Sequence, residues 1–384
     1  ADTGGYDHAV NLILSGTGLT INASSQRTYT FSKSVKGTGN FTLATASGSA
    51  LTYVFSGDIS EWDGAFVVNA NGTATPTTTL NLTGGGNLFS GAEGSGEKVI
   101  GVVMNRGGVL NVNIGKDSAD TTMRGSIGFG VVKTGTLNLT GQGNTEFQKT
   151  VDVSQMTVSS GKTATLNAAT TVGTMAAGSG SVTLGDSVTL NLGGGTANAQ
   201  KQHNIGTLSG VNASVTLGNH ATLNLGGGGT AETPVTHSIG TLTGGTGSNL
   251  HLKESDSTIF NGSITGINAI TMDTGVRAQF TNTVNASKVT VNGSVQFDKT
   301  LTLSGNLEFS GYADNRAELH AAGNSVLVLD LSNRSSAKGT LVLKSEASLT
   351  ITNDPKAGGG ALWMEENTSV QLEDKAWLKW GTVT

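Results

Sequence analysis

The densest group of acidic side chains in this sequence lies in one short segment, residues 58–64. Asp58, Glu61 and Asp63 surround Trp62 there. An exposed indole ring is a platform on which a sugar can stack, and carboxylates beside it can accept hydrogen bonds from sugar hydroxyls. The segment is therefore our first candidate for glycan binding, while an exposed loop between two strands explains the same residues equally well.

Catalysis on a carbohydrate needs more than this cluster supplies. Lyases and glycoside hydrolases use clustered aspartates for calcium or paired carboxylates for acid and base steps. The chain has no Asp-Asp pair, no Gly-Gly-x-Gly-x-Asp calcium repeat, and no nucleophile elbow, phosphate loop or dinucleotide fingerprint. We expect no catalytic residue and no cofactor. A carbohydrate-active enzyme with a site built from loops is the alternative.

The composition excludes several other classes of function. The 384 residues include 57 Gly, 3 Pro and no Cys, and the net charge is −5. The lack of Cys excludes disulfide frameworks, thiol catalysis and cysteine metal sites. A mildly acidic chain without basic clusters gives no surface for nucleic acid or anionic lipid. No apolar run reaches the ~18 residues that span a bilayer, so we expect a soluble, already processed chain without direct membrane insertion.

Internal repeats are the strongest signal for the fold. Residues 181–195 return as residues 214–228, and residues 203–210 return as residues 237–244. Within each copy, aliphatic residues alternate with Thr, Ser or Asn, which is the pattern of a half-buried strand. The repeats therefore predict short strands joined by turns.

A recurring three-residue phrase predicts which face of these strands is buried. The phrase is Leu-Asn-Leu or Leu-Asn-Val, and it occurs at residues 80–82, 110–112, 137–139, 190–192 and 223–225. In a strand its two aliphatic residues share one face and Asn takes the other. We expect the aliphatic residues to point inward.

These patterns predict an all-β fold, a single right-handed parallel β-helix over residues 1–360 with three short strands in each coil. The repeat lengths indicate coils of about 25–30 residues. Glycine suits the tight corners, and scarce proline suits ladders that use nearly every N–H group. Residues 361–384 hold three of the four Trp residues, and we expect a C-terminal cap or a junction to a downstream anchor or translocator there.

The repeats also predict which residues stack on one another. Leu190 and Leu223 should be neighbours on adjacent coils, about 4.8 Å apart. His203 and His237 should also lie one coil apart, but no third ligand accompanies them and we expect no metal site. The predicted core comprises Val182, Leu184, Leu190, Leu192, Ile205, Val215, Leu217, Leu223, Leu225 and Ile239.

Surface loops hold the remaining candidates. The insertions at residues 193–202 and 226–236 should lie side by side on consecutive coils and form a second binding patch. Two groups of charged residues are interpreted as solvated loops. They are Lys116, Asp117, Asp120 and Arg124, and Lys253, Glu254 and Asp256.

Parts of the chain resemble a known repeat. Residues 55–60, 64–68 and 79–91 read Phe-Ser-Gly-Asp-Ile-Ser, Gly-Ala-Phe-Val-Val and Thr-Leu-Asn-Leu-Thr-Gly-Gly-Gly-Asn-Leu-Phe-Ser-Gly, and residues 260–266 and 300–311 repeat the beginning and the end of this pattern. The pattern resembles the passenger-associated repeat of bacterial autotransporters. The resemblance implies a secreted or cell-surface β-helical rod of a Gram-negative bacterium, in a group that includes self-associating and host-binding adhesins.

We therefore expect an extracellular scaffold or adhesin, not an enzyme. A long regular face would bind host glycans, other surfaces or a second copy through many weak contacts at a fixed spacing. The predicted binding residues are Asp58, Glu61, Trp62 and Asp63. A structural filament subunit is a third interpretation.

Overall fold

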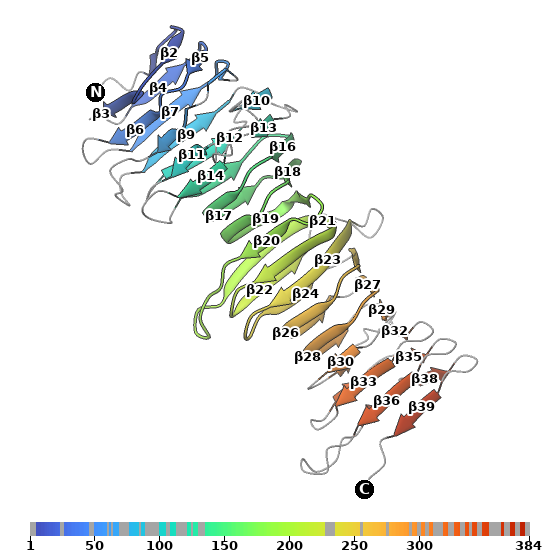
Figure 1. Ribbon diagram of the computed structural model, residues 1–384. Coiled ribbons are helices and arrows are strands. Elements are labelled where there is room, and N and C mark those ends of the chain that lie inside the picture. Colours follow the sequence, from blue (N-terminus) through green and yellow to red (C-terminus); the bar gives the residue numbers. More distant parts are fainter. Residues whose placement is uncertain are drawn as a thin grey trace. The chain divides into compact units, whose positions relative to one another are not determined.

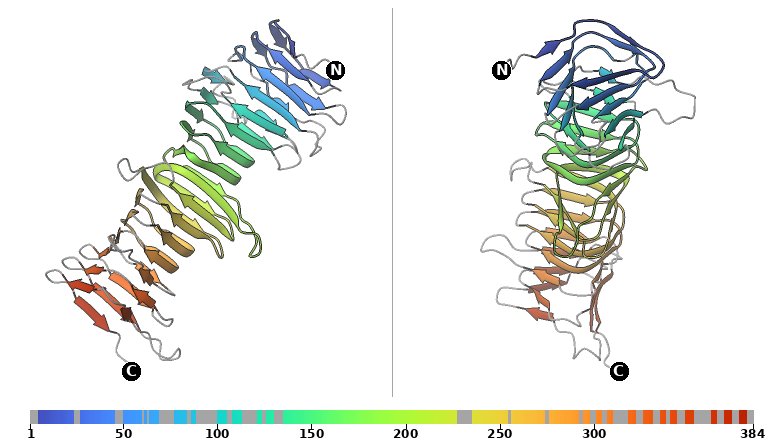
Figure 2. Two further views of the ribbon diagram at one scale, coloured as in Figure 1. Left: turned by 180° about the vertical axis from the view of Figure 1, so that it is seen from behind. Right: turned by 90° about the vertical axis from the view of Figure 1, so that its left-hand side faces the viewer.

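The chain folds into parallel β-strands stacked coil upon coil, as predicted (Figures 1 and 2). In this computed structural model, every regular element among the described residues is a strand. The described residues are 5–23, 27–45, 50–59, 61–62, 64–68, 77–83, 86–88, 100–104, 108–112, 121–123, 126–129, 135–226, 235–253, 256–273, 276–291 and 294–297, and beyond residue 300 the strands β30 to β39. Within these ranges we find no helix long and apolar enough to cross a membrane. Two compact units can be distinguished, residues 1–190 and 191–384.

In the first unit the chain passes through three walls in turn. The first wall consists of β1 (Tyr6–Asp7), β4 (Thr28–Phe31), β7 (Leu51–Phe55), β9 (Thr78–Leu82), β12 (Gly108–Val112), β15 (Thr136–Leu139), the end of β17 (Val151–Val158) and the middle of β19 (Thr170–Leu184). The second consists of β3 (Leu19–Ala23), β6 (Phe41–Thr45), β8 (Phe66–Val68), β11 (Ile100–Met104), β14 (Ser126–Phe129) and the beginnings of β17 and β19. The third position in the coil is taken by β2 (Leu12–Leu14), β5 (Val35–Gly37) and Trp62, and later by β10 (Gly86–Leu88), β13 (Thr121–Met123), β16 (Gly143–Phe147), β18 (Lys162–Leu166) and the end of β19.

The second unit also has three walls, which we call A, B and C in chain order. Wall A consists of the beginning of β21 (Lys201–Leu217), β22 (Ala221–Leu225), β24 (Asn249–Leu252), the ends of β26 (Ile264–Met272) and β28 (Val284–Val291), β31 (Leu307–Phe309), β34 (Ser335–Ala337) and β37 (Leu362–Met364). Wall B consists of the middle of β21, the beginning of β23 (Thr236–Gly244), β25 (Ser257–Phe260), β27 (Arg277–Phe280), β29 (Ser294–Phe297), β32 (Glu318–Ala321), β35 (Thr340–Leu343) and β38 (Ser369–Leu372). Wall C consists of the ends of β21 and β23, the beginnings of β26 and β28, β30 (Leu301–Leu303), β33 (Val326–Asp330), β36 (Ser348–Thr352) and β39 (Trp377–Trp380).

The strands within residues 361–384 belong to these ladders. β37, β38 and β39 pair in parallel with β34, β35 and β36 respectively. The boundary at residue 360, and a role of the last residues as a cap, stay predictions.

The length of a coil varies more than the repeats predict. The coil that leads from Leu137 to its partner Met156 is shorter than expected, and so is the coil from Met156 to its partner Met175. The coil from Phe66 to its partner Val102, in contrast, is longer than expected. The expected coil of about 25–30 residues is wrong for these coils. Corners as short as residues 159–161 join the strands of the tighter ones.

The sequence repeat does not correspond to one coil. Leu223 pairs with His203 on one side and with Leu250 on the other, so the prediction that Leu190 is its neighbour is wrong. From His203 on wall A the chain passes walls B, C and A again before it reaches His237 on wall B. The repeat therefore spans one coil plus one strand, and equivalent residues fall on different walls. The predicted stacking of the two histidines is wrong for the same reason.

The predicted core is confirmed. All ten predicted residues are buried, namely Val182, Leu184, Leu190, Leu192, Ile205, Val215, Leu217, Leu223, Leu225 and Ile239. The three-residue phrase also has its predicted orientation, since Leu80 and Leu82 are buried and Asn81 is only half-buried. Asn111 Nδ2 donates to Asn81 Oδ1 at 2.7 Å, and Asn138 Nδ2 donates to Asn111 Oδ1 at 2.8 Å. These bonds form an amide ladder along the outside of the first wall.

Candidate functional site

The acidic segment around Trp62 does not form the predicted sugar platform. The Trp62 side chain is 0% exposed. Its ring centre lies 4.6 Å from that of Phe66 and 6.5 Å from that of Phe41, and its Nε1–H donates to the Gly39 carbonyl at 2.9 Å. The expectation of an exposed Trp62 is therefore wrong, because the indole ring is part of the core.

Local backbone geometry explains why Trp62 is buried. Trp62 occupies the third position of its coil, where a single bridge to Gly37 replaces a strand. The turn that follows needs Gly64, because a Cβ atom there would lie 2.3 Å from Trp62 Nε1. A one-residue bridge leaves no alternation of apolar and polar residues, so the sequence pattern resembles that of an exposed loop.

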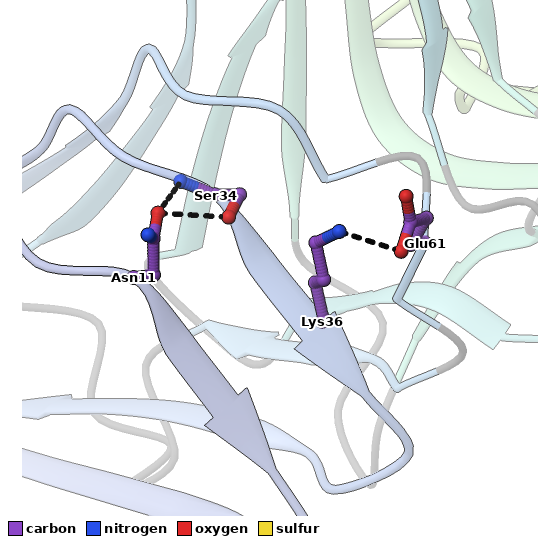
Figure 3. Close-up of polar contacts among 4 residues, drawn as sticks. All are labelled: Asn11, Ser34, Lys36 and Glu61. Atoms are coloured by element: carbon purple, nitrogen blue, oxygen red, sulfur yellow. Dashed lines mark hydrogen bonds and ion pairs between the residues drawn. The ribbon is translucent and has the colours of Figure 1, made fainter.

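Two carboxylates of this segment belong to exposed residues, Asp58 and Glu61. Glu61 Oε2 forms an ion pair with Lys36 Nζ at 2.7 Å (Figure 3). Close to this pair, Asn11 Oδ1 accepts hydrogen bonds from the backbone N and the Oγ of Ser34 at 3.2 and 2.9 Å. The polar groups of this corner thus bind one another from coil to coil, and glycan binding by Asp58 and Glu61 stays a prediction.

Several other predicted residues lie outside the described part of the chain. They are Asp63, Lys116, Asp117, Asp120, Arg124, Glu254 and the loop residues 227–234. Lys253 is half-buried. Asp256 is only 2% exposed, so its interpretation as a solvated loop residue is wrong.

Asp256 lies close to both ends of one predicted loop. Its Oδ1 accepts the N–H of Val235 at 3.2 Å, and its Oδ2 lies 3.5 Å from His237 Nε2. His237 is fully buried, and its Nδ1 accepts the N–H of Leu208 at 3.2 Å. Burial lowers the pKa of His237, and the neighbouring Asp256 opposes this shift. Gly226, at the other end of the loop, has φ of 107°, and a Cβ there would lie 2.2 Å from Asp256 Oδ2.

The other insertion begins after β20 (Thr189–Leu192) and forms a small exposed hairpin. Thr196 and Ala199 exchange backbone hydrogen bonds of 3.0 and 3.1 Å, and residues 196–200 are exposed. The buried His203 anchors its base, with Nε2 2.9 Å from the Gly193 carbonyl. Burial lowers the pKa of His203, and the neutral ring donates its Nε2–H to that carbonyl.

The two insertions do not lie side by side. Residues 193–200 lead into wall A at the beginning of β21, whereas Gly226 leaves wall A at the end of β22. The length of a wall A strand therefore separates their described ends, and the prediction of one shared patch is wrong. Because the sequence repeat spans one coil plus one strand, the two insertions fall at different corners of the coil.

A chain of polar side chains runs along wall A from coil to coil. Asn224 Nδ2 donates to Gln202 Oε1 at 3.0 Å and to the His203 carbonyl at 3.3 Å. Asn224 Oδ1 lies 3.2 Å from His251 Nδ1, and His251 Nε2 lies 2.8 Å from Asp273 Oδ1. The His251 and Asp273 side chains are each 31% exposed. Four consecutive coils thus contribute to one hydrogen-bonded polar row, in which Asn224 is buried and His251 and Asp273 are partly exposed.

A groove lies along the corner where wall C passes into wall A. It has a volume of about 430 Å³ and is lined by residues 246–247, 266–268 and 285–287, from three consecutive coils. Gly247 and Gly266 have φ of 68° and 70°, and a Cβ on Gly266 would lie 2.3 Å from the Gly244 carbonyl. Glycine is therefore required at this corner, and its lack of a side chain leaves the groove open.

The side chains at this groove offer hydrogen-bonding groups to a ligand. Asn268 Nδ2 donates to Asn249 Oδ1 at 3.2 Å, which links the groove to wall A. Among the described residues, Asn268 Oδ1, Asn285 and Ser287 have no side-chain hydrogen-bond partner, and Asn268 and Asn285 are exposed. An arrangement of this kind can bind hydroxyl or amide groups of a ligand.

Sequence reasoning did not identify this groove or the polar row. Their residues are Asn, Ser, Thr and Gly, which are abundant throughout the chain. The one available signal was the nearly even spacing of Gly247, Gly266 and Ala286 along the chain. The coils here have a similar length, since Asn249 pairs with Ala269 and Ala269 pairs with Lys288, and the longer sequence repeat conceals it.

The described residues contain no group of three or more His, Asp or Glu side chains that could hold a metal ion. The chain was compared with family models, curated proteins and solved structures. It matches no family model, no curated protein and no solved structure. The candidate site therefore depends on its own geometry.

Proposed function

We propose that this chain is an extracellular scaffold that binds extended polymers, above all host glycans, without catalysis. The observation that carries this proposal is the corner groove, which three consecutive coils build together. Weak polar contacts are available from Thr246 on the first coil, from Asn268 on the second, and from Asn285 and Ser287 on the third. Such contacts reinforce one another when a single polymer reaches several of them.

The proposal also includes the surface of a Gram-negative cell, or the medium around it, as the location. Its support is the resemblance of residues 55–60, 64–68, 79–91, 260–266 and 300–311 to the autotransporter passenger repeat, together with the parallel β-solenoid fold. In this proposal the solenoid acts as an adhesin. Binding between two copies of the chain is part of the same expectation.

A carbohydrate-active enzyme is the second candidate function. It is favoured by the half-exposed His251–Asp273 pair, because His251 lies on the same strand as the groove neighbour Asn249. Both ring nitrogens of His251 already face oxygen atoms, of Asn224 and Asp273, so neither is directed at a hydroxyl nucleophile. This arrangement is better suited to binding than to catalysis.

One experiment separates the two functions. Purified protein is incubated with neutral and acidic polysaccharides, with and without calcium, and bound polymer, reducing ends and unsaturated products are measured. We expect retention of polymer without new ends. Turnover that disappears in Asp273→Asn, Asp58→Ala or Glu61→Ala would overturn the non-catalytic proposal. Failure to retain any polymer would contradict the scaffold proposal itself.

A further inference from the structure

We infer that the corner groove binds an unbranched neutral polysaccharide that runs along the stacking direction, with about one sugar for each coil. This inference rests on the proposed function and names the ligand class of the same site. It follows from the chemistry of the lining, the spacing of the coils and the shape of the floor.

The lining favours a neutral ligand rich in hydroxyl groups. The side chains that line the groove carry no charge, and their polar groups are carboxamides and hydroxyls. A carboxamide offers a donor and an acceptor together, so Asn268 and Asn285 can each bond to hydroxyls on one sugar. An acidic polymer would need a cation such as Arg or Lys for its carboxylates, and none lines the groove.

The spacing favours a polymer with a short regular repeat. Corner residues of successive coils lie about 4.8 Å apart along the stack. The backbone register of wall A pairs Asn249 with Ala269 and Ala269 with Lys288, and it therefore places Asn268 beside Ser287 of the next coil. An extended chain of pyranose sugars advances by a similar distance per residue, so successive sugars meet successive coils.

The floor allows close contact with the flat face of a sugar. Gly247 and Gly266 have no side chain. Ile267 and Ala286 also line the groove, are almost fully buried and expose only a small apolar surface there. Sugar rings present C–H groups on their faces and hydroxyls at their edges. A sugar lying on this floor would therefore direct its hydroxyls toward the Asn and Ser side chains at the sides.

The test is isothermal titration calorimetry of the full chain with cello-oligosaccharides and laminari-oligosaccharides of two to six sugars, and with hexagalacturonate. We expect affinity for at least one neutral series to rise until the ligand spans about three coils and then to level off. The double variant N268A/N285A should weaken that binding about tenfold, because two exposed hydrogen bonds are lost. The matched control Asn198→Ala changes an exposed residue of the hairpin and should bind like the unaltered protein.

Three results would overturn the inference. The first is tighter binding of hexagalacturonate that weakens with added salt, which would indicate an ionic site. The second is neutral-glycan binding that N268A/N285A leaves unchanged, which would move the site elsewhere and leave the scaffold function standing. The third is binding of none of these oligosaccharides. If immobilised polysaccharides are also not retained, the proposed function fails together with this inference.

Discussion

Replacing Trp62 tests whether this residue belongs to the core or to a binding surface. The change Trp62→Ala removes a fully buried ring that packs on Phe66 and Phe41 and donates to the Gly39 carbonyl. Deleting a buried Trp side chain typically lowers the free energy of unfolding by about 3–5 kcal/mol. Trp62→Phe keeps most of the packing but leaves the carbonyl without its donor, which should cost about 1–3 kcal/mol.

The assay is urea unfolding followed by circular dichroism, with the free energy obtained by linear extrapolation. Glu61→Ala serves as the matched control, because it removes only an exposed ion pair with Lys36 and should cost less than about 1 kcal/mol. The order of stability should be Glu61→Ala, then Trp62→Phe, then Trp62→Ala. If Trp62→Ala unfolds like the unaltered protein but loses affinity for glycans, the ring is a surface platform and our placement of it is refuted.

Three further changes test the second unit and the turn geometry. Leu223→Asp places a carboxylate in the dry core and should cost more than about 4 kcal/mol, so unchanged thermal melting would contradict the assigned core. Burial lowers the pKa of His203 and His237. As the pH falls through ~6.5, the unfolded chain therefore binds more protons than the folded chain, and the free energy of unfolding should decrease in acid. Urea unfolding midpoints at pH 8 and pH 5 measure this decrease, which should be smaller in the double variant H203Q/H237Q. An equal decrease in that variant would show that other groups cause the pH dependence. Gly226→Ala should destabilise the protein more than Gly16→Ala. Both positions have positive φ, but only Gly226 also lacks room for a Cβ atom. Equal unfolding midpoints of the two variants would exclude that steric effect.

The parts of the fold that depend on alternation were predictable from the sequence. The Leu-Asn-Leu phrase at residues 80–82 predicts both the buried leucines and the outward Asn81, since successive side chains of a strand point to opposite faces. The hydrogen bond from Asn111 to Asn81 follows once parallel strands are stacked in register. Local pattern is sufficient here because backbone geometry alone decides the outcome.

The parts that depend on register between coils were not predictable in this way. His203 and His237 share a sequence context, yet one lies on wall A and the other on wall B, because the repeat covers one coil plus one strand. Trp62 lies among acidic residues in the sequence, as a residue of an exposed loop would. Its backbone bridge to Gly37 and its packing on aromatic rings nevertheless place its side chain in the core. Neither fact leaves a periodic signal, since each depends on residues distant in sequence.

In the proposed function, the corner of walls C and A is the surface that binds a polymer. The most direct measurement is amide hydrogen exchange of the full chain with and without a bound neutral oligosaccharide, followed by mass spectrometry of its peptides. We predict slower exchange at residues 246–247, 266–268 and 285–287 together, and no change at residues 58–64. Protection at residues 58–64, with unchanged exchange at all three corner segments, would contradict the account.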